Sequence, residues 1–255
     1  MRQPASSLRA TVLAATARVP CVQLDGDVSD SGSVTITGLA SRSAEPVLRR
    51  LVSGAADGAP FDLHVATFDG AFCNTLDTIR PVAGRFGSQA TDIQLSPKSG
   101  VGRLHENANI VPHFVMPDYA GYAQLSYITA DGTLVHLHPS NEARQIDITA
   151  PDGRRQSLKL QGMDFRQFAS GAAVNIADPA TCNCKPGEVG WQVAPPYGVD
   201  MMMITVSSQP LFAQRRPVDD TTDAYLRDLQ AALDGATRRG IRVNARAILV
   251  ETAPR

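Results

Sequence analysis

The residues of this sequence with the clearest chemical potential are Cys182 and Cys184, which flank one asparagine in the stretch ADPATCNCKPGEVGWQ. A redox dithiol usually has the spacing C-x-x-C at the start of a helix, which lowers the pKa of the attacking thiol. A structural zinc site needs two further ligands at short spacing. Neither pattern is present, since Lys185, Pro186 and Gly187 follow and no second closely spaced cysteine pair exists. We therefore predict a Cys182–Cys184 disulfide in an exposed loop, with free thiols or a redox or metal role as alternatives.

Two further cysteines lie far apart in the first third of the chain. Cys21 begins an apolar stretch that we expect to form a strand, and Cys73 follows the end of another. A bridge between them would close a loop of about 50 residues, worth roughly 3–4 kcal/mol in the chain-entropy model. We favour this disulfide, and the alternative is a pair of buried free thiols. The even number of cysteines, four, fits two bridges and an oxidising compartment, although four cysteines allow three pairings.

The sequence HLH is the other stretch that could bind a metal. It places His136 and His138 on one face of an expected strand, with side chains about 7 Å apart. No carboxylate–histidine cluster lies nearby in the sequence, and polar residues commonly alternate along a half-solvated strand. We interpret both histidines as outward-facing polar residues and assign no metal ligand.

Common enzyme signatures are absent from the sequence. It contains no G-x-S-x-G elbow, P-loop, G-x-G-x-x-G or H-E-x-x-H motif. The carboxylate pairs Asp27 with Asp30 and Asp219 with Asp220 are more simply turn formers and helix-start residues. We expect no catalytic residue and no cofactor.

The overall composition is that of a globular protein without a strong net electrostatic field. Of the 255 residues, 43% are hydrophobic and 19% are charged, and 24 Lys and Arg balance 25 Asp and Glu. This balance argues against binding to nucleic acid or anionic lipid. Arg9 and Arg18 interrupt the short apolar stretch at the N-terminus, which is therefore not a convincing signal peptide. The chain is either cytosolic or a soluble piece of a longer exported or membrane-anchored protein, and the cysteines favour the second.

The elements that would position these residues change character along the chain. Residues 6–18 predict a helix, 21–28 and 31–40 two strands, 43–53 a second helix and 60–73 a third strand. In the second helix an apolar stripe at i, i+3, i+4, i+7 and i+8 is expected to face the core. Its members are Ala44, Val47, Leu48, Leu51 and Val52. The order helix–strand–strand–helix–strand predicts a small α+β module with its helices on one face of a sheet.

A stretch rich in Gly, Ser and Pro suggests a domain boundary near residue 85, which gives domains 1–85 and 86–255. The second domain consists of short strand-like runs separated by turns at 130–132 and 151–153, which indicates an antiparallel β-sandwich. MMMI at 201–204 is expected to fill its core. One helix is expected, capped by Thr221 or Thr222 and stopped by Gly240, before a final strand.

Longer stretches resemble a known kind of bacterial region. LRATVLAATARVPCVQLDGDV, GSVTITGLA and FDLHVATFDGAFCNTLDTIRPVA resemble an extracytoplasmic, BON-like α+β module of membrane proteins that carry a Ser/Thr-kinase-like or caspase-like domain. MPDYAGYAQLSYITADGTLVHLHPS, PPYGVDMMMITVSSQPLF and YLRDLQAAL resemble a β-rich domain of unknown function at the C-terminus of such proteins. The matching motifs are structural and transfer no catalytic residue, no kinase motif is present, and the insert at 140–190 departs from the pattern.

From these features we expect a non-catalytic sensing or scaffolding region. It would be periplasmic or otherwise extracytoplasmic, belong to a longer membrane-anchored protein, and bind a protein or cell-envelope component. We expect no binding to nucleic acid and no membrane insertion by this chain itself. The alternative is a metal- or thiol-dependent activity centred on Cys182, Cys184 and the histidines.

Overall fold

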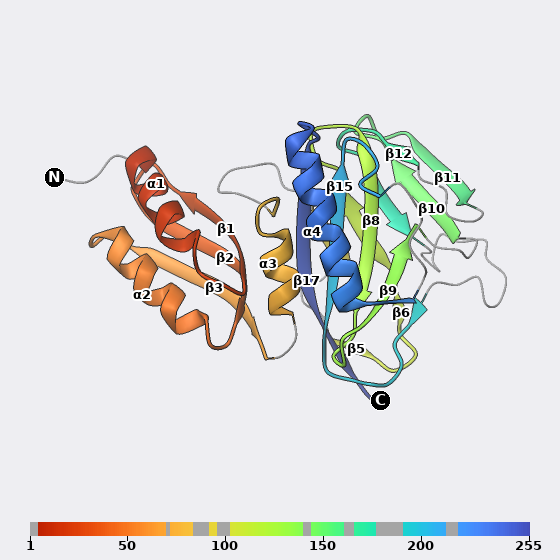
Figure 1. Ribbon diagram of the computed structural model, residues 1–255, viewed down its shortest axis with the longest axis horizontal. Coiled ribbons are helices and arrows are strands. Elements are labelled where there is room, and N and C mark those ends of the chain that lie inside the picture. Colours follow the sequence, from red (N-terminus) through yellow and green to blue (C-terminus); the bar gives the residue numbers. More distant parts are fainter. Residues whose placement is uncertain are drawn as a thin grey trace. The chain divides into compact units, whose positions relative to one another are not determined.

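The computed structural model describes residues 5–69, 72–83, 92–95, 103–139, 144–160, 166–176, 191–212 and 219–255 (Figure 1). It divides into two compact units, Met1–Gln89 and Ala90–Arg255. The division lies close to the boundary expected near residue 85, and independent folding of each unit stays a prediction.

The N-terminal unit has the α+β order that the sequence predicts, with one added helix. Its elements are α1 (Ala5–Thr16), β1 (Val22–Val28), β2 (Val34–Ser41), α2 (Glu45–Ala56), β3 (Phe61–Phe68) and α3 (Cys73–Ile79). The sheet has the order β1-β2-β3, in which β1 is antiparallel and β3 parallel to β2. Helix α2 is the crossover that a parallel pair requires. Helix α3 was not foreseen from the sequence.

The core of this unit lies between one face of the sheet and helices α1 and α2. Alternate strand residues such as Val34 and Ile36 face the helices and are fully buried. In α2 the buried side chains are Leu48, Val52 and Ala56. The expectation that Val47 and Leu51 would also face the core is wrong, because a helix lying on a sheet buries only a narrow stripe and both residues lie on its flank.

Gly38 is required where β2 passes β1. Its φ of 142° lies in the region that favours glycine, and a Cβ built there would stand 2.0 Å from the carbonyl oxygen of Gln23. Any side chain would therefore force the two strands apart.

The C-terminal unit is a β-sandwich with one helix. Its strands are β4 (Asp92–Leu95), β5 (Arg103–His105), β6 (Asn109–Ile110), β7 (Pro112–Val115), β8 (Gly121–Ile128), β9 (Thr133–His138), β10 (Arg144–Thr149), β11 (Arg155–Leu160), β12 (Gln167–Phe168), β13 (Ala173–Ile176), β14 (Trp191–Gln192), β15 (Val199–Ser207), β16 (Asp219–Thr221) and β17 (Val243–Ala253). The main path of the larger sheet has the order β16-β9-β8-β15-β17-β5, with β12 paired to β8, and the smaller has the order β11-β10-β13-β7-β4. The pairing is antiparallel except between β17 and β5.

The core of the C-terminal unit is filled from both sheets. Phe114 and Val174 come from the smaller sheet, while Leu125, Met202 and Ile204 come from the larger one. The prediction that MMMI lies in the core is confirmed, since all four residues are buried. The turns predicted at 130–132 and 151–153 are also confirmed, because each joins two antiparallel strands and has glycine at positive φ.

Helix α4 (Thr222–Arg238) begins and ends as its sequence signals indicate. Thr221 is the N-cap, and its hydroxyl accepts a hydrogen bond from the backbone N–H of Ala224. Gly240, at a φ of 66°, follows the end of the helix. The buried face of α4 includes Tyr225, and the helix runs along the larger sheet (Figure 1).

Candidate functional site

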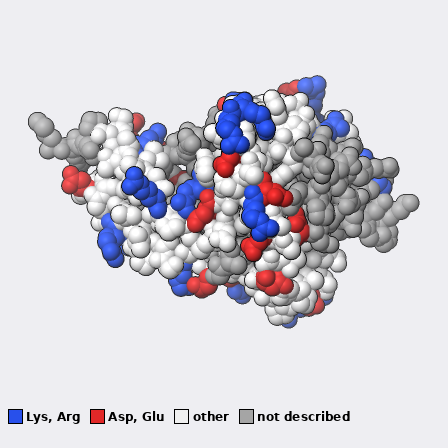
Figure 2. Space-filling view, in the orientation of Figure 1, with Lys and Arg blue, Asp and Glu red and all other residues white. Residues whose placement is uncertain are grey.

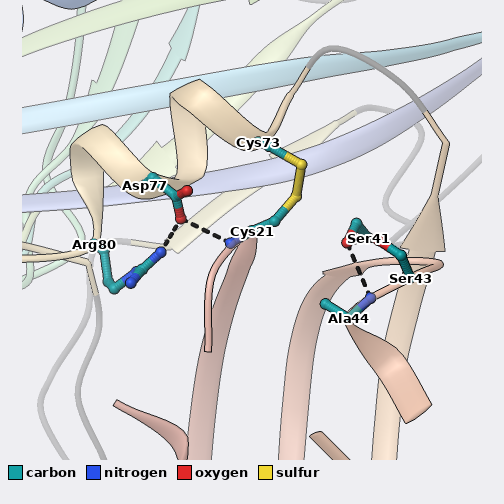
Figure 3. Close-up of a disulfide and its surroundings, with 7 residues drawn as sticks. All are labelled: Cys21, Ser41, Ser43, Ala44, Cys73, Asp77 and Arg80. Atoms are coloured by element: carbon teal, nitrogen blue, oxygen red, sulfur yellow. Dashed lines mark hydrogen bonds and ion pairs between the residues drawn. A yellow bond between two sulfur atoms is a disulfide. The ribbon is translucent and has the colours of Figure 1, made fainter. Parts of the chain in front are cut away.

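The disulfide of the N-terminal unit joins Cys21 to Cys73 (Figure 3). It ties the residue before β1 to the first residue of α3. The Asp77 carboxylate accepts a hydrogen bond of 2.7 Å from the Cys21 backbone N–H and also pairs with Arg80. Cys21 has a φ of 60°, which is uncommon for a residue with a side chain. The bridge and the Asp77 contact together hold this conformation, so this pair of cysteines is structural.

The other two cysteines, Cys182 and Cys184, lie outside the described residues. Their disulfide, and the alternatives to it, stay predictions. Among the described residues, no group of three or more His, Cys, Asp or Glu side chains could hold a metal ion.

The two histidines of HLH do not face solvent, so that expectation is wrong. His136 and His138 are both buried. The His136 ring packs on Tyr225 of α4, with ring centroids 4.8 Å apart, because α4 covers this part of the sheet. The His138 ring instead packs on Phe168, which belongs to the core between the sheets. An irregularity of register between β8 and β9 interrupts the alternation that would have put both on one face.

A serine, a histidine and an aspartate do meet beside α4. The Ser126 hydroxyl lies 2.9 Å from Nδ1 of His136, and Nε2 of His136 lies 3.9 Å from Asp220. These are the residue types of a hydrolytic triad. However, Ser126 is 0% exposed and lies on β8 in the larger sheet, so no substrate carbonyl can reach it in this conformation. The contact links β8, β9 and β16 at the start of α4 and serves packing.

A second buried polar cluster centres on Asp200, which is 2% exposed. Its carboxylate accepts hydrogen bonds from the Tyr127 hydroxyl at 2.6 Å, the Ala130 backbone N–H at 2.7 Å and the Thr252 hydroxyl at 3.2 Å. Burial raises the pKa of Asp200, and burial followed by the hydrogen bond to Asp200 raises the pKa of Tyr127. The cluster joins β8, its following turn, β15 and β17, and the side chains of Tyr127, Asp200 and Thr252 are all buried.

The surface of the N-terminal unit is the remaining candidate, and its apolar part is on α2. In the described part of the chain, the large hydrophobic side chains classed as exposed are Val47, at 43%, and Leu51, at 38%. They are one helical turn apart, so they form one apolar spot. We call the exposed residues of α1 and α2, with Ala17 and Arg18, the helix layer. Small side chains, including Ala10 and Ala14 of α1, form much of the rest of it.

The helix layer is also basic. Its exposed residues include Arg18, Arg49 and Arg50, and one exposed acid, Asp57, lies beside it as the C-cap of α2. Glu45, which is half-buried, pairs with Arg49 at 2.7 Å. Within the described ranges neither Arg18 nor Arg50 has an ion-pair partner. Figure 2 shows several blue groups and fewer red ones on the largely white surface of this unit.

The opposite face of the same sheet carries acidic residues. Asp25, Asp27 and Asp62 alternate with core-facing residues of β1 and β3, and β1, β2 and β3 contain no Lys or Arg. Of these acids, Asp27 pairs with Arg9 of α1 at 2.7 Å. Thr35 of β2 lies in register between Asp27 and Asp62. The unit is therefore electrically polarised, with a basic, partly apolar helix layer and an acidic sheet face. This surface is not predicted by the sequence pattern, because the spacing of Val47 and Leu51 is that of core residues.

None of the helices in the described part of the chain is long and apolar enough to cross a membrane.

Comparison with known proteins adds no family. No family model and no curated protein matches the chain. Solved structures with weak similarity include a family 123 glycoside hydrolase from Clostridium perfringens, at 7% identity and a TM-score of 0.24. The alignment covers 65% of this chain and 28% of the hydrolase chain. The E. coli chaperone DraB matches at 11% identity and a TM-score of 0.20, over 65% of this chain and 56% of that chain. The chain thus spans less than two thirds of either protein, and similarity at this level supports no functional conclusion.

Proposed function

We propose that this chain is a non-catalytic binding region of an extracytoplasmic protein, and that it recruits a protein partner through the helix layer. The observation that carries the proposal is the exposure of Val47 and Leu51 side by side on α2. Single exposed aliphatic residues are ordinary on protein surfaces, but adjacent ones on a helix provide the apolar centre that protein interfaces use.

Two other features support the proposal. The Cys21–Cys73 disulfide suits an oxidising compartment such as the periplasm. The two buried polar clusters, around His136 and Asp200, have their hydrogen bonds directed into the fold, so they supply no accessible nucleophile or base. A sensing or scaffolding role within a longer membrane-anchored protein agrees with the resemblance described from the sequence.

Site-specific photo-crosslinking tests this proposal in the cells that make the protein. A benzophenone amino acid is placed at Leu51, with a control at Arg227, an exposed residue of α4. We expect a discrete crosslinked protein from Leu51 only, found in the extracytoplasmic fraction. We also expect Cys21 and Cys73 of this chain to resist alkylation until the disulfide is reduced. Equal crosslinking at both positions, or alkylation of Cys21 and Cys73 in cells without reduction, would contradict the proposal.

A further inference from the structure

We infer that the partner of the helix layer is an acidic amphipathic segment, in which apolar side chains are flanked by Asp or Glu. This inference rests on the proposed function and adds the chemistry of the partner to it. It comes from three properties of the described residues, namely an apolar centre, unpaired cations in the same helix layer, and the absence of a matching surface on a second copy.

The apolar centre sets the first requirement. Val47 and Leu51 are one turn apart on α2, and α1 beside it exposes small residues such as Ala10 and Ala14. Small side chains allow the backbone of a partner to approach closely, while the larger pair provides contact area. A partner helix with apolar residues at i, i+3 and i+4, or a strand with alternate apolar residues, could cover such a spot.

The charges set the second requirement. Arg50 lies on the same helix as the apolar pair, and Arg18 follows α1; neither has an ion-pair partner among the residues that the structure describes. Arg49 is already engaged by Glu45 through two hydrogen bonds. A carboxylate on the partner can therefore pair with Arg50 or Arg18 without breaking an existing ion pair. Such rim pairs govern orientation, specificity and association rate more than the affinity itself.

A second copy of the chain meets the charge requirement but not the apolar one. The acidic face of the sheet could oppose the arginines, but its outward residues are polar, as in the row formed by Asp27, Thr35 and Asp62. Among the described residues it offers no large exposed hydrophobic side chain to set opposite Val47 and Leu51. A different partner that combines carboxylates with apolar side chains fits both properties of the layer.

The experiment measures fluorescence anisotropy of labelled helical peptides with the oxidised 255-residue chain. Three peptides of about 18 residues share one leucine face and differ only in their flanking residues, which are Glu, Gln or Lys. We expect the Glu peptide to bind about tenfold more tightly than the Gln peptide, and the Lys peptide to bind most weakly. Raising the NaCl concentration from about 50 mM to about 500 mM should remove most of the preference for Glu.

Variants locate the contact. The double substitution Val47→Ser and Leu51→Ser should weaken binding of the Glu peptide about tenfold, because it removes the apolar centre. Arg50→Glu should abolish the preference for Glu over Gln while leaving the apolar contact. Arg227→Glu, on an exposed face of α4, is the matched control. It should change neither the affinity for the Glu peptide nor the preference for Glu over Gln. Far-UV circular dichroism checks that each variant keeps its fold.

The outcomes separate this inference from the proposed function. Equal binding of the Glu and Gln peptides, lost only on changing Val47 and Leu51, would overturn the acidic partner and keep a protein-binding helix layer. Failure of all three peptides to bind overturns the inference, whereas the crosslinking at Leu51 decides the proposed function. Binding to vesicles of phosphatidylglycerol and phosphatidylcholine in place of peptides would identify a lipid surface. Concentration-dependent dimerisation in sedimentation, lost on Arg50→Glu, would identify a second copy, and either result overturns the inference.

Discussion

His138 should make the C-terminal unit sensitive to mild acid. The residue is 4% exposed and packs on Phe168, and burial lowers its pKa from 6.5 to about 4. In the unfolded chain the imidazole takes up a proton near pH 6.5, whereas in the folded chain it resists protonation until about pH 4. Between these values the unfolded state binds more protons, so stability falls as the pH falls.

The size of the effect follows from the two pKa values. Each unit of difference corresponds to about 1.36 kcal/mol, so a shift from 6.5 to about 4 amounts to about 3 kcal/mol. This contribution is fully present above pH 6.5 and is lost as the pH falls through the window down to about 4. Replacing His138 with Leu removes the titrating group, so the stability of the variant should lack this part of the pH dependence.

Urea unfolding followed by the fluorescence of Trp191, the single tryptophan, reports on this unit. The difference in unfolding free energy between wild type and His138→Leu should change by about 3 kcal/mol between pH 7 and pH 4, in favour of the variant at low pH. His105→Gln, at an exposed histidine of β5, is the matched control and should run parallel to wild type. Parallel curves for wild type and His138→Leu across this range would show that burial of His138 does not cause the loss of stability in acid.

Three further predictions concern stability. Replacing Cys21 and Cys73 with Ala removes a link across 52 residues and should cost about 3–4 kcal/mol in the N-terminal unit, which calorimetry with and without reductant can measure; an unchanged midpoint would contradict a structural bridge. Asp200→Ala leaves the Tyr127 hydroxyl and a backbone N–H without their acceptor and should cost about 3 kcal/mol in chemical unfolding, whereas Asp200→Asn should cost less because its amide oxygen still accepts. Gly38→Ala should destabilise the N-terminal unit strongly, since its Cβ would meet a backbone carbonyl at 2.0 Å, and wild-type stability would show that the strands can separate without cost.

Many of the helices and strands, and their order, could be predicted from local sequence patterns. Periodicity placed α2 and the strands around it, and the cap at Thr221 with the stop at Gly240 defined α4. These features depend on local backbone and side-chain energetics, so a short window of sequence contains them. The burial of MMMI was also readable, because a strand that is apolar at every position must be covered on both faces.

Which side of each helix or strand is buried depends instead on contacts between distant parts of the chain. Val47 and Leu51 have the spacing of core residues, yet the flank of α2 that carries them is exposed, and this depends on how the helix lies on the sheet. His136 is buried because α4, some 90 residues later in the sequence, packs on it. Ser126, His136 and Asp220 meet because β8 and β16 both pair with β9. Burial is a property of contacts between distant segments, so no local pattern could assign these side chains to core or surface.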